Sequence, residues 1–115
     1  NLIKNTKFPE ELRKEILNEF KKLKASLVAV RSSATAEDSS TASWAGELET
    51  YLNTDKKNLI LNVKKCWSSL FTPRAIFYRH ERKLIKAKVS VVVVIQTMVQ
   101  SEISGITFTV HPVTQ

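Results

Sequence analysis

Residues 27–52, LVAVRSSATAEDSSTASWAGELETYL, constrain the fold more than any other part of the chain. They open with the apolar run Leu-Val-Ala-Val, which is long enough for a buried strand and too short for a helix. Arg31 follows, and then a polar segment rich in Ser, Thr, Asp and Glu that ends at Gly46. Residues 48–52 alternate between apolar and polar side chains, as a strand does. The stretch therefore predicts strand, polar loop and strand, with a fixed cation at the mouth of the loop.

An arginine at the end of a strand is suited to binding phosphate. Ligands on α/β sheets bind beyond the strand ends, and a guanidinium presents two donors to phosphate oxygens. The loop adds hydroxyls and backbone N–H groups, and Gly46 would let the backbone approach a ligand closely. In the alternative interpretation the loop is solvated and Arg31 forms a surface ion pair with Glu37 or Asp38. Neither GxGxxG nor GxxxxGK[ST] is present.

Three segments have the apolar spacing of amphipathic helices. The first is predicted over residues 8–25, with Pro9 at its first position and one apolar face that covers a side of the sheet. The second follows capping side chains at residues 53–55, and Cys66 lies on its apolar stripe as a buried small hydrophobe. The third begins with Thr72 as N-cap and Pro73 as the first helical residue, and ends near Lys86. The apolar faces consist, in chain order, of Leu12, Ile16, Phe20 and Leu23; Leu59, Val63, Cys66, Trp67 and Leu70; and Ile76, Phe77, His80 and Leu84.

Two further strands are predicted in the C-terminal part. Residues 91–95 are an unbroken apolar row, which is typical of a central strand buried on both faces. Gln96 ends the row, and its amide needs a partner, either a backbone group or a ligand at the edge of the sheet. Residues 103–110 alternate between apolar residues and threonine and are predicted to form the last strand.

Composition bounds the class of protein. A chain of 115 residues with 43% hydrophobic and 25% charged residues is expected to form one globular domain at most. One cysteine excludes an internal disulfide and favours a reducing compartment, taken as the cytoplasm. No apolar run approaches the length of a membrane span, so no membrane association is expected. The net charge of +7 comes largely from lysines near the predicted helix ends, and no nucleic-acid-binding pattern accompanies them.

Two motifs carry a resemblance to a known family. VAVRSSATAED followed by ASWAGELETYLN resembles the nucleotide-binding domain of phosphoenolpyruvate synthases (pyruvate, water dikinases), and pyruvate phosphate dikinase and rifampicin phosphotransferase are similar. VVVVIQTMVQSEISGITFTVHPVT resembles a second motif of the family, so that the resemblance covers about residues 26–114. Trp44 stands where the family usually has Phe, and Glu47 where it usually has Gln.

The resemblance implies a fold and a set of partners. The fold would be α+β, a fragment of an ATP-grasp-like nucleotide-binding domain with about three helices on a small mixed sheet. Residues 1–115 would form a single piece of the N-terminal ATP-binding domain. The family passes phosphate from ATP to a histidine on another domain and then to pyruvate. The implied partners are therefore ATP with Mg²⁺, the remaining ATP-grasp subdomain, a phosphohistidine domain and a pyruvate-binding domain.

The resemblance also implies the binding residues. Four positions match the family's ATP-binding residues, namely Arg31, Gly46, Thr50 and Gln96. The family's lysine, its metal-binding glutamate and its phosphorylated histidine have no match in the chain, so no residue is assigned a catalytic or metal-binding role. The chain alone is expected to be inactive. Two alternatives remain: the same domain of a rifampicin phosphotransferase or pyruvate phosphate dikinase, and a basic interaction module that has lost ATP binding.

Overall fold

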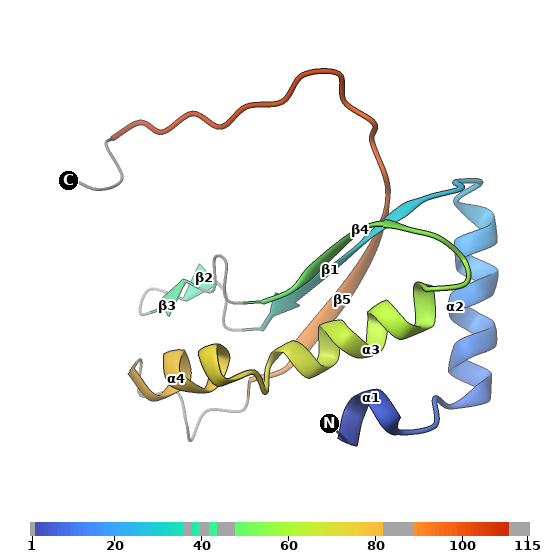
Figure 1. Ribbon diagram of the computed structural model, residues 1–115, viewed down its shortest axis with the longest axis horizontal. Coiled ribbons are helices and arrows are strands. Elements are labelled where there is room, and N and C mark those ends of the chain that lie inside the picture. Colours follow the sequence, from blue (N-terminus) through green and yellow to red (C-terminus); the bar gives the residue numbers. More distant parts are fainter. Residues whose placement is uncertain (1, 36–37, 40–41, 44–47, 82–88, 111–115) are drawn as a thin grey trace.

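The structure is a computed structural model that describes residues 2–35, 38–39, 42–43, 48–81 and 89–110. The elements in chain order are α1 (Leu2–Asn5), α2 (Glu10–Lys22), β1 (Val28–Ala34), β2 (Asp38–Ser39), β3 (Ala42–Ser43), β4 (Thr50–Thr54), α3 (Leu59–Ser69), α4 (Pro73–Glu81) and β5 (Val91–Thr97) (Figure 1). Helices and a small sheet together confirm the expected α+β class.

The sheet has three strands in the order β4-β1-β5, and a separate pair is formed by β2 and β3. Both pairings of β1 are antiparallel, so the sheet is antiparallel where a mixed one was expected. The prediction that residues 91–95 form the central strand is wrong, because β1 occupies the centre and β5 an edge. Val92 and Val94 are 53% and 44% exposed because they share the face of the sheet that α2 and α3 leave open.

The helices α2 and α3 cover one face of the sheet, and the core lies between these helices and the sheet. Val28 and Val30 of β1 are fully buried against Leu59 and Val63 of α3, in a cluster that also contains Phe20 of α2. Full burial of one such aliphatic side chain stabilises the fold by about 1.5–3 kcal/mol relative to exposure. The apolar stripe predicted for the second helix is therefore confirmed, and it fixes which face of the sheet is buried.

The first predicted helix corresponds to α2, which is shorter than expected. It covers Glu10–Lys22, where residues 8–25 were expected. Lys24 has a positive φ of 50°, a left-handed conformation that a helix cannot continue through. Pro9 precedes the first helical residue.

The third predicted helix corresponds to α4, which starts as predicted but packs differently. The backbone N–H of Ala75 donates to Oγ1 of Thr72 over 3.3 Å, which makes Thr72 a cap for the turn that begins at Pro73. Ala75 is the buried residue of this helix. Ile76 and Phe77 are 53% and 67% exposed and His80 is exposed, so their predicted inward orientation is wrong; Leu84 and Lys86 lie outside the described residues.

The last predicted strand is also wrong. Residues 101–110 are exposed throughout and form no strand, and Ile103 and Ile106 are 91% and 84% exposed. Figure 1 shows this segment running away from the sheet. An alternating pattern specifies a strand only when another strand edge is available to pair with it, and in the described part of the chain no strand pairs with this segment.

Candidate functional site

Arg31 lies on the face of the sheet opposite the helices. Val28 and Val30 point into the helix-covered core, and the alternation of a strand turns Arg31 to the other side, where it is exposed. Arg31 lies in the middle of β1, whereas the sequence had suggested that it lies at the end of a strand. Its Cα pairs with that of Thr50 on β4 and that of Val94 on β5. The arginine is therefore flanked by both neighbouring strands.

Gln96 joins the arginine from the third strand. Its Cα pairs with that of Ala29, two residues before Arg31 on β1. Nη1 of Arg31 donates to Oε1 of Gln96 over 3.5 Å. The partner of the Gln96 carbonyl oxygen is thus the guanidinium, and this bond does not use the two Nε2 hydrogens of the exposed Gln96 side chain.

These residues line one hollow of about 350 Å³. It is bounded by Ala29, Arg31, Thr50, Leu52, Gln96, Thr97, Met98 and Val99. Three of the four sequence-predicted ATP-binding residues are thus brought together by three different strands. Sequence reasoning missed the apolar walls, although Ala29 and Leu52 each stand two positions from a predicted residue and therefore share its face of the sheet.

The structure does not describe the fourth predicted binding residue, Gly46, or the side chains suggested as ion-pair partners of Arg31. Gly46 and Glu37 lie outside the described residues, and the side chain of Asp38 is not described either. The surface ion pair suggested by the sequence therefore stays a prediction. Among the described residues the ion pairs are those of Arg13 with Glu10 and of Lys22 with Glu19, both within α2.

The hollow combines a cation, a hydroxyl, an amide and apolar walls. A guanidinium binds oxyanions through charge-assisted hydrogen bonds, which are stronger than neutral ones. The hydroxyl of Thr50 and the amide of Gln96 supply further donors, while Leu52 and Met98 offer apolar surface. Such a set suits a ligand with a phosphate group at one end and a less polar part beside it.

Behind the hollow, on the helix side of the sheet, a buried thiol packs against the β1–β4 pair. Sγ of Cys66 lies 3.7 Å from the carbonyl oxygens of Val30 and Glu49. Burial, and next the charge of Glu49, raise the pKa of Cys66 to about 11, against a smaller opposing effect of a hydrogen bond with Ser32. The thiol is therefore protonated at neutral pH and can donate to a carbonyl. Burial, followed by Glu49 and Cys66, also raises the pKa of Tyr51.

Contacts join β4 and β1 to the segment that follows β5, beside the hollow. Nε2 of Gln100 donates to Oδ1 of Asn53 over 3.2 Å, and Asn53 has a positive φ of 49°. Asparagine tolerates this conformation better than most residues. The backbone N–H of Met98 donates to the carbonyl of Leu27 over 3.2 Å, which holds the wall of the hollow against β1.

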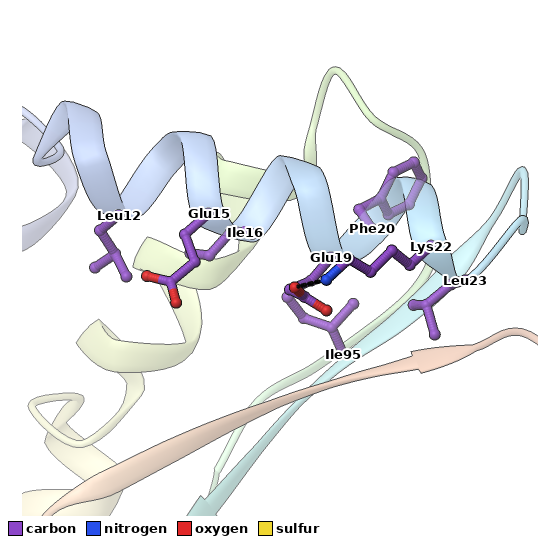
Figure 2. A pocket seen from close by; sticks show the side chains of 8 residues that line it. All are labelled: Leu12, Glu15, Ile16, Glu19, Phe20, Lys22, Leu23 and Ile95. Carbon is purple, nitrogen blue, oxygen red and sulfur yellow. Dashed lines mark hydrogen bonds and ion pairs between the residues drawn. The ribbon is translucent and has the colours of Figure 1, made fainter.

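A second groove, of about 470 Å³, lies between α2 and β5 (Figure 2). Its lining residues are Leu12, Glu15, Ile16, Glu19, Phe20, Lys22, Leu23 and Ile95. The lining is mostly apolar, and Glu19 and Lys22 pair with each other within it. It contains none of the sequence-predicted binding residues, so we place the candidate site in the smaller hollow around Arg31.

Neither a metal cluster nor a membrane span is found among the described residues. No group of three or more His, Cys, Asp or Glu side chains comes together there as a metal site. None of the helices described is both long and apolar enough to cross a membrane.

Comparison with known proteins gives the chain its family. Residues 1–115 match the family described as pyruvate phosphate dikinase, AMP/ATP-binding domain. The chain is 59% identical over 87 residues to a probable phosphoenolpyruvate synthase of Archaeoglobus fulgidus, and 47% identical over 120 aligned residues to the phosphoenolpyruvate synthase of Pyrococcus furiosus. It is 55% identical over 87 residues to the rifampicin phosphotransferase of Bacillus cereus.

The matches cover most of this chain and a small part of the relatives. They include 75%, 98% and 75% of the chain, in the order given, and 12%, 15% and 10% of those three relatives. The match with the family extends over the whole chain and contains both motifs that were recognised in the sequence. The chain therefore belongs to the pyruvate phosphate dikinase AMP/ATP-binding domain family.

Proposed function

We propose that the chain is part of the ATP-binding domain of a phosphoenolpyruvate synthase. Such an enzyme converts ATP, pyruvate and water to phosphoenolpyruvate, AMP and phosphate, by way of a phosphohistidine on another domain. The observation that carries the proposal is the convergence of Arg31, Thr50 and Gln96 on one hollow, from three separate parts of the sequence.

Each of these residues has a proposed contact with ATP. Arg31 binds phosphate oxygens, where its fixed charge compensates charge that moves during phosphoryl transfer. Thr50 donates its hydroxyl to the same phosphates, and Gln96 holds the guanidinium while its Nε2 hydrogens contact the nucleotide. Gly46 completes the set through its backbone, as the family motif implies. Mg²⁺ accompanies ATP in the proposal, and its ligands are expected outside this chain because the family's metal-binding glutamate has no match in the sequence.

The remaining partners of the proposal lie outside this chain. They are the other ATP-grasp subdomain, the phosphohistidine domain and the pyruvate-binding domain, in a reducing compartment such as the cytoplasm. Because phosphoryl transfer depends on complete positioning of the phosphates, the 115 residues alone are predicted to give no turnover.

The test is an assay of the full-length protein with ATP and either pyruvate or rifampicin as acceptor. The proposal predicts phosphoenolpyruvate formation that requires both ATP and pyruvate and releases AMP. Transfer to rifampicin without reaction on pyruvate would assign the chain to a rifampicin phosphotransferase. Absence of ATP binding to the full-length protein would leave the basic interaction module as the surviving alternative.

A further inference from the structure

Ser32 makes two hydrogen bonds to one backbone carbonyl beside the candidate site. Its backbone N–H donates to the carbonyl oxygen of Glu49 over 3.3 Å, and its hydroxyl donates to the same oxygen over 2.5 Å. Ser32 and Glu49 are the residues next to the Arg31–Thr50 pair, so these bonds extend the β1–β4 ladder one step past that pair. Just before Glu49, the side chain of Leu48 packs against the cluster of Ala34, Leu70 and Ala75.

Thr50 stands at the end of the regular β1–β4 pairing. Thr50 is the first residue of β4, and the register shifts between the pairs made by Val28 and Val30. An irregularity of this kind interrupts the ladder and bends the strand. The hydrogen bonds to the Glu49 carbonyl therefore help to hold the Thr50 hydroxyl in place relative to the guanidinium of Arg31.

Cys66 contacts the same carbonyl from the helix side of the sheet. It is fully buried, with Sγ 3.7 Å from the Glu49 carbonyl oxygen. A hydrogen bond away from water is electrostatically stronger than an exposed one, and water cannot readily replace a lost donor there. The Ser32 hydroxyl itself is part-buried on the helix side of the sheet, on the opposite face from Arg31.

We propose that Ser32 is a positioning residue for ATP, which sets the Thr50 hydroxyl against the Arg31 guanidinium through the Glu49 carbonyl. This inference rests on the proposed function of the site. Ser32 reaches no ligand in the hollow, because it lies on the other face of the sheet and is not among the residues that line it. Its effect on ATP therefore passes through Thr50.

The test measures ATP affinity of the full-length protein by titration calorimetry, together with the melting temperature. Ser32→Ala should weaken ATP binding by about fivefold to tenfold, the range expected for losing one hydrogen bond of ordinary strength. The backbone N–H of Ser32 still satisfies the Glu49 carbonyl, so the variant should fold. Ser32→Thr retains a hydroxyl in a residue suited to strands and should restore most of the affinity.

A double-mutant cycle separates positioning from a general structural effect. If Ser32 acts through Thr50, Ser32→Ala combined with Thr50→Ala should bind ATP as weakly as Thr50→Ala alone. Fully additive losses would overturn the proposal. Ser68→Ala is the matched control, because its buried hydroxyl also donates to a backbone carbonyl, that of Lys65 over 2.8 Å, in a helix away from the hollow. It should leave ATP affinity unchanged.

The outcomes distinguish this inference from the proposed function. If Arg31→Ala and Thr50→Ala both leave ATP affinity unchanged, the ATP site itself is wrong and the role of Ser32 fails with it. If those two variants weaken binding and Ser32→Ala does not, the site stands and the positioning role alone is refuted.

Discussion

Arg31 and Gln96 lie 65 positions apart in the sequence, and their side chains meet on the open face of the sheet, with Nη1 of the arginine 3.5 Å from Oε1 of the glutamine. The bond links the central strand to an edge strand. A neutral amide at this distance orients the guanidinium without neutralising it. The positive charge of Arg31 therefore remains available to an anion.

Changing the amide of Gln96 to a carboxylate should make the positive charge of Arg31 less available to an anion. In Gln96→Glu the new charge pairs with Arg31 and competes with phosphate, so the KM for ATP of the full-length protein should rise by about tenfold or more. The melting temperature should change little, since an exposed ion pair contributes about 0–1 kcal/mol. Steady-state kinetics and a thermal melt of the same preparation check both parts.

Gln100→Glu is the control for net charge. It adds the same negative charge near the hollow, where Gln100 contacts Asn53 and not Arg31. An equal loss of ATP affinity in this control would show general repulsion, and would contradict a specific Arg31–Gln96 contact.

The sequence predicted local elements better than their arrangement. The stripe of Leu59, Val63 and Cys66 was buried as predicted, and Thr72 caps the helix that begins at Pro73. These features depend on residues within a few positions of one another, so the sequence alone specifies them. The position of a strand in a sheet depends on residues far away, which is why an apolar row of valines suggested a central strand and proved to be an edge.

The same contrast between local features and long-range arrangement applies to the candidate site. Arg31, Thr50 and Gln96 were predicted through a family resemblance, and the structure places them on one hollow. Spacing alone could not have joined them, because their proximity follows from the order of the strands. The sequence placed the Ser32 hydroxyl among the loop donors, and the positioning role proposed for it could not be predicted, because its partner is a backbone carbonyl, which leaves no trace in residue type.

Hydrogen exchange should follow the observed strand order. The sequence favoured residues 91–95 as the most protected segment, whereas the structure places β1 between two strands and leaves one edge of β5 unpaired among the described strands. The amides of Val93 and Ile95 point away from β1 toward this unpaired edge, so they should exchange faster than those of Val28 and Val30, both fully buried. Amide exchange followed by NMR checks this order, and slower exchange in β5 than in β1 would contradict the strand order.

Stability should fall in alkaline solution through Cys66. Burial raises the pKa of the folded thiol to about 11, whereas the unfolded thiol ionises near its ordinary value of 9.0. The stabilisation is fully present below the unfolded pKa and is lost as the pH rises toward the folded one, because the unfolded chain then binds fewer protons. Tyr51, whose pKa is also raised, should add to the decline.

Chemical denaturation between about pH 8 and pH 11 measures this decline. Cys66→Ala is less stable at the lower end because it leaves a cavity, and its stability should fall less steeply with pH than that of the unmodified chain. Identical slopes for the two proteins would refute the buried, protonated thiol.

The central claim is that Arg31 binds the phosphates of ATP, and its most direct test is the kcat/KM for ATP of Arg31→Ala in the full-length protein. Charge-assisted contacts contribute about 1.5–3 kcal/mol, so kcat/KM should fall by about tenfold to a hundredfold, with the melting temperature unchanged. Arg31→Lys should recover only part of the lost kcat/KM, because an ammonium keeps the charge but lacks the paired donors of a guanidinium. Lys57→Ala, at an exposed lysine outside the hollow, should change nothing. An unchanged kcat/KM with a lowered melting temperature would instead identify Arg31 as a structural ion-pair partner and end the claim.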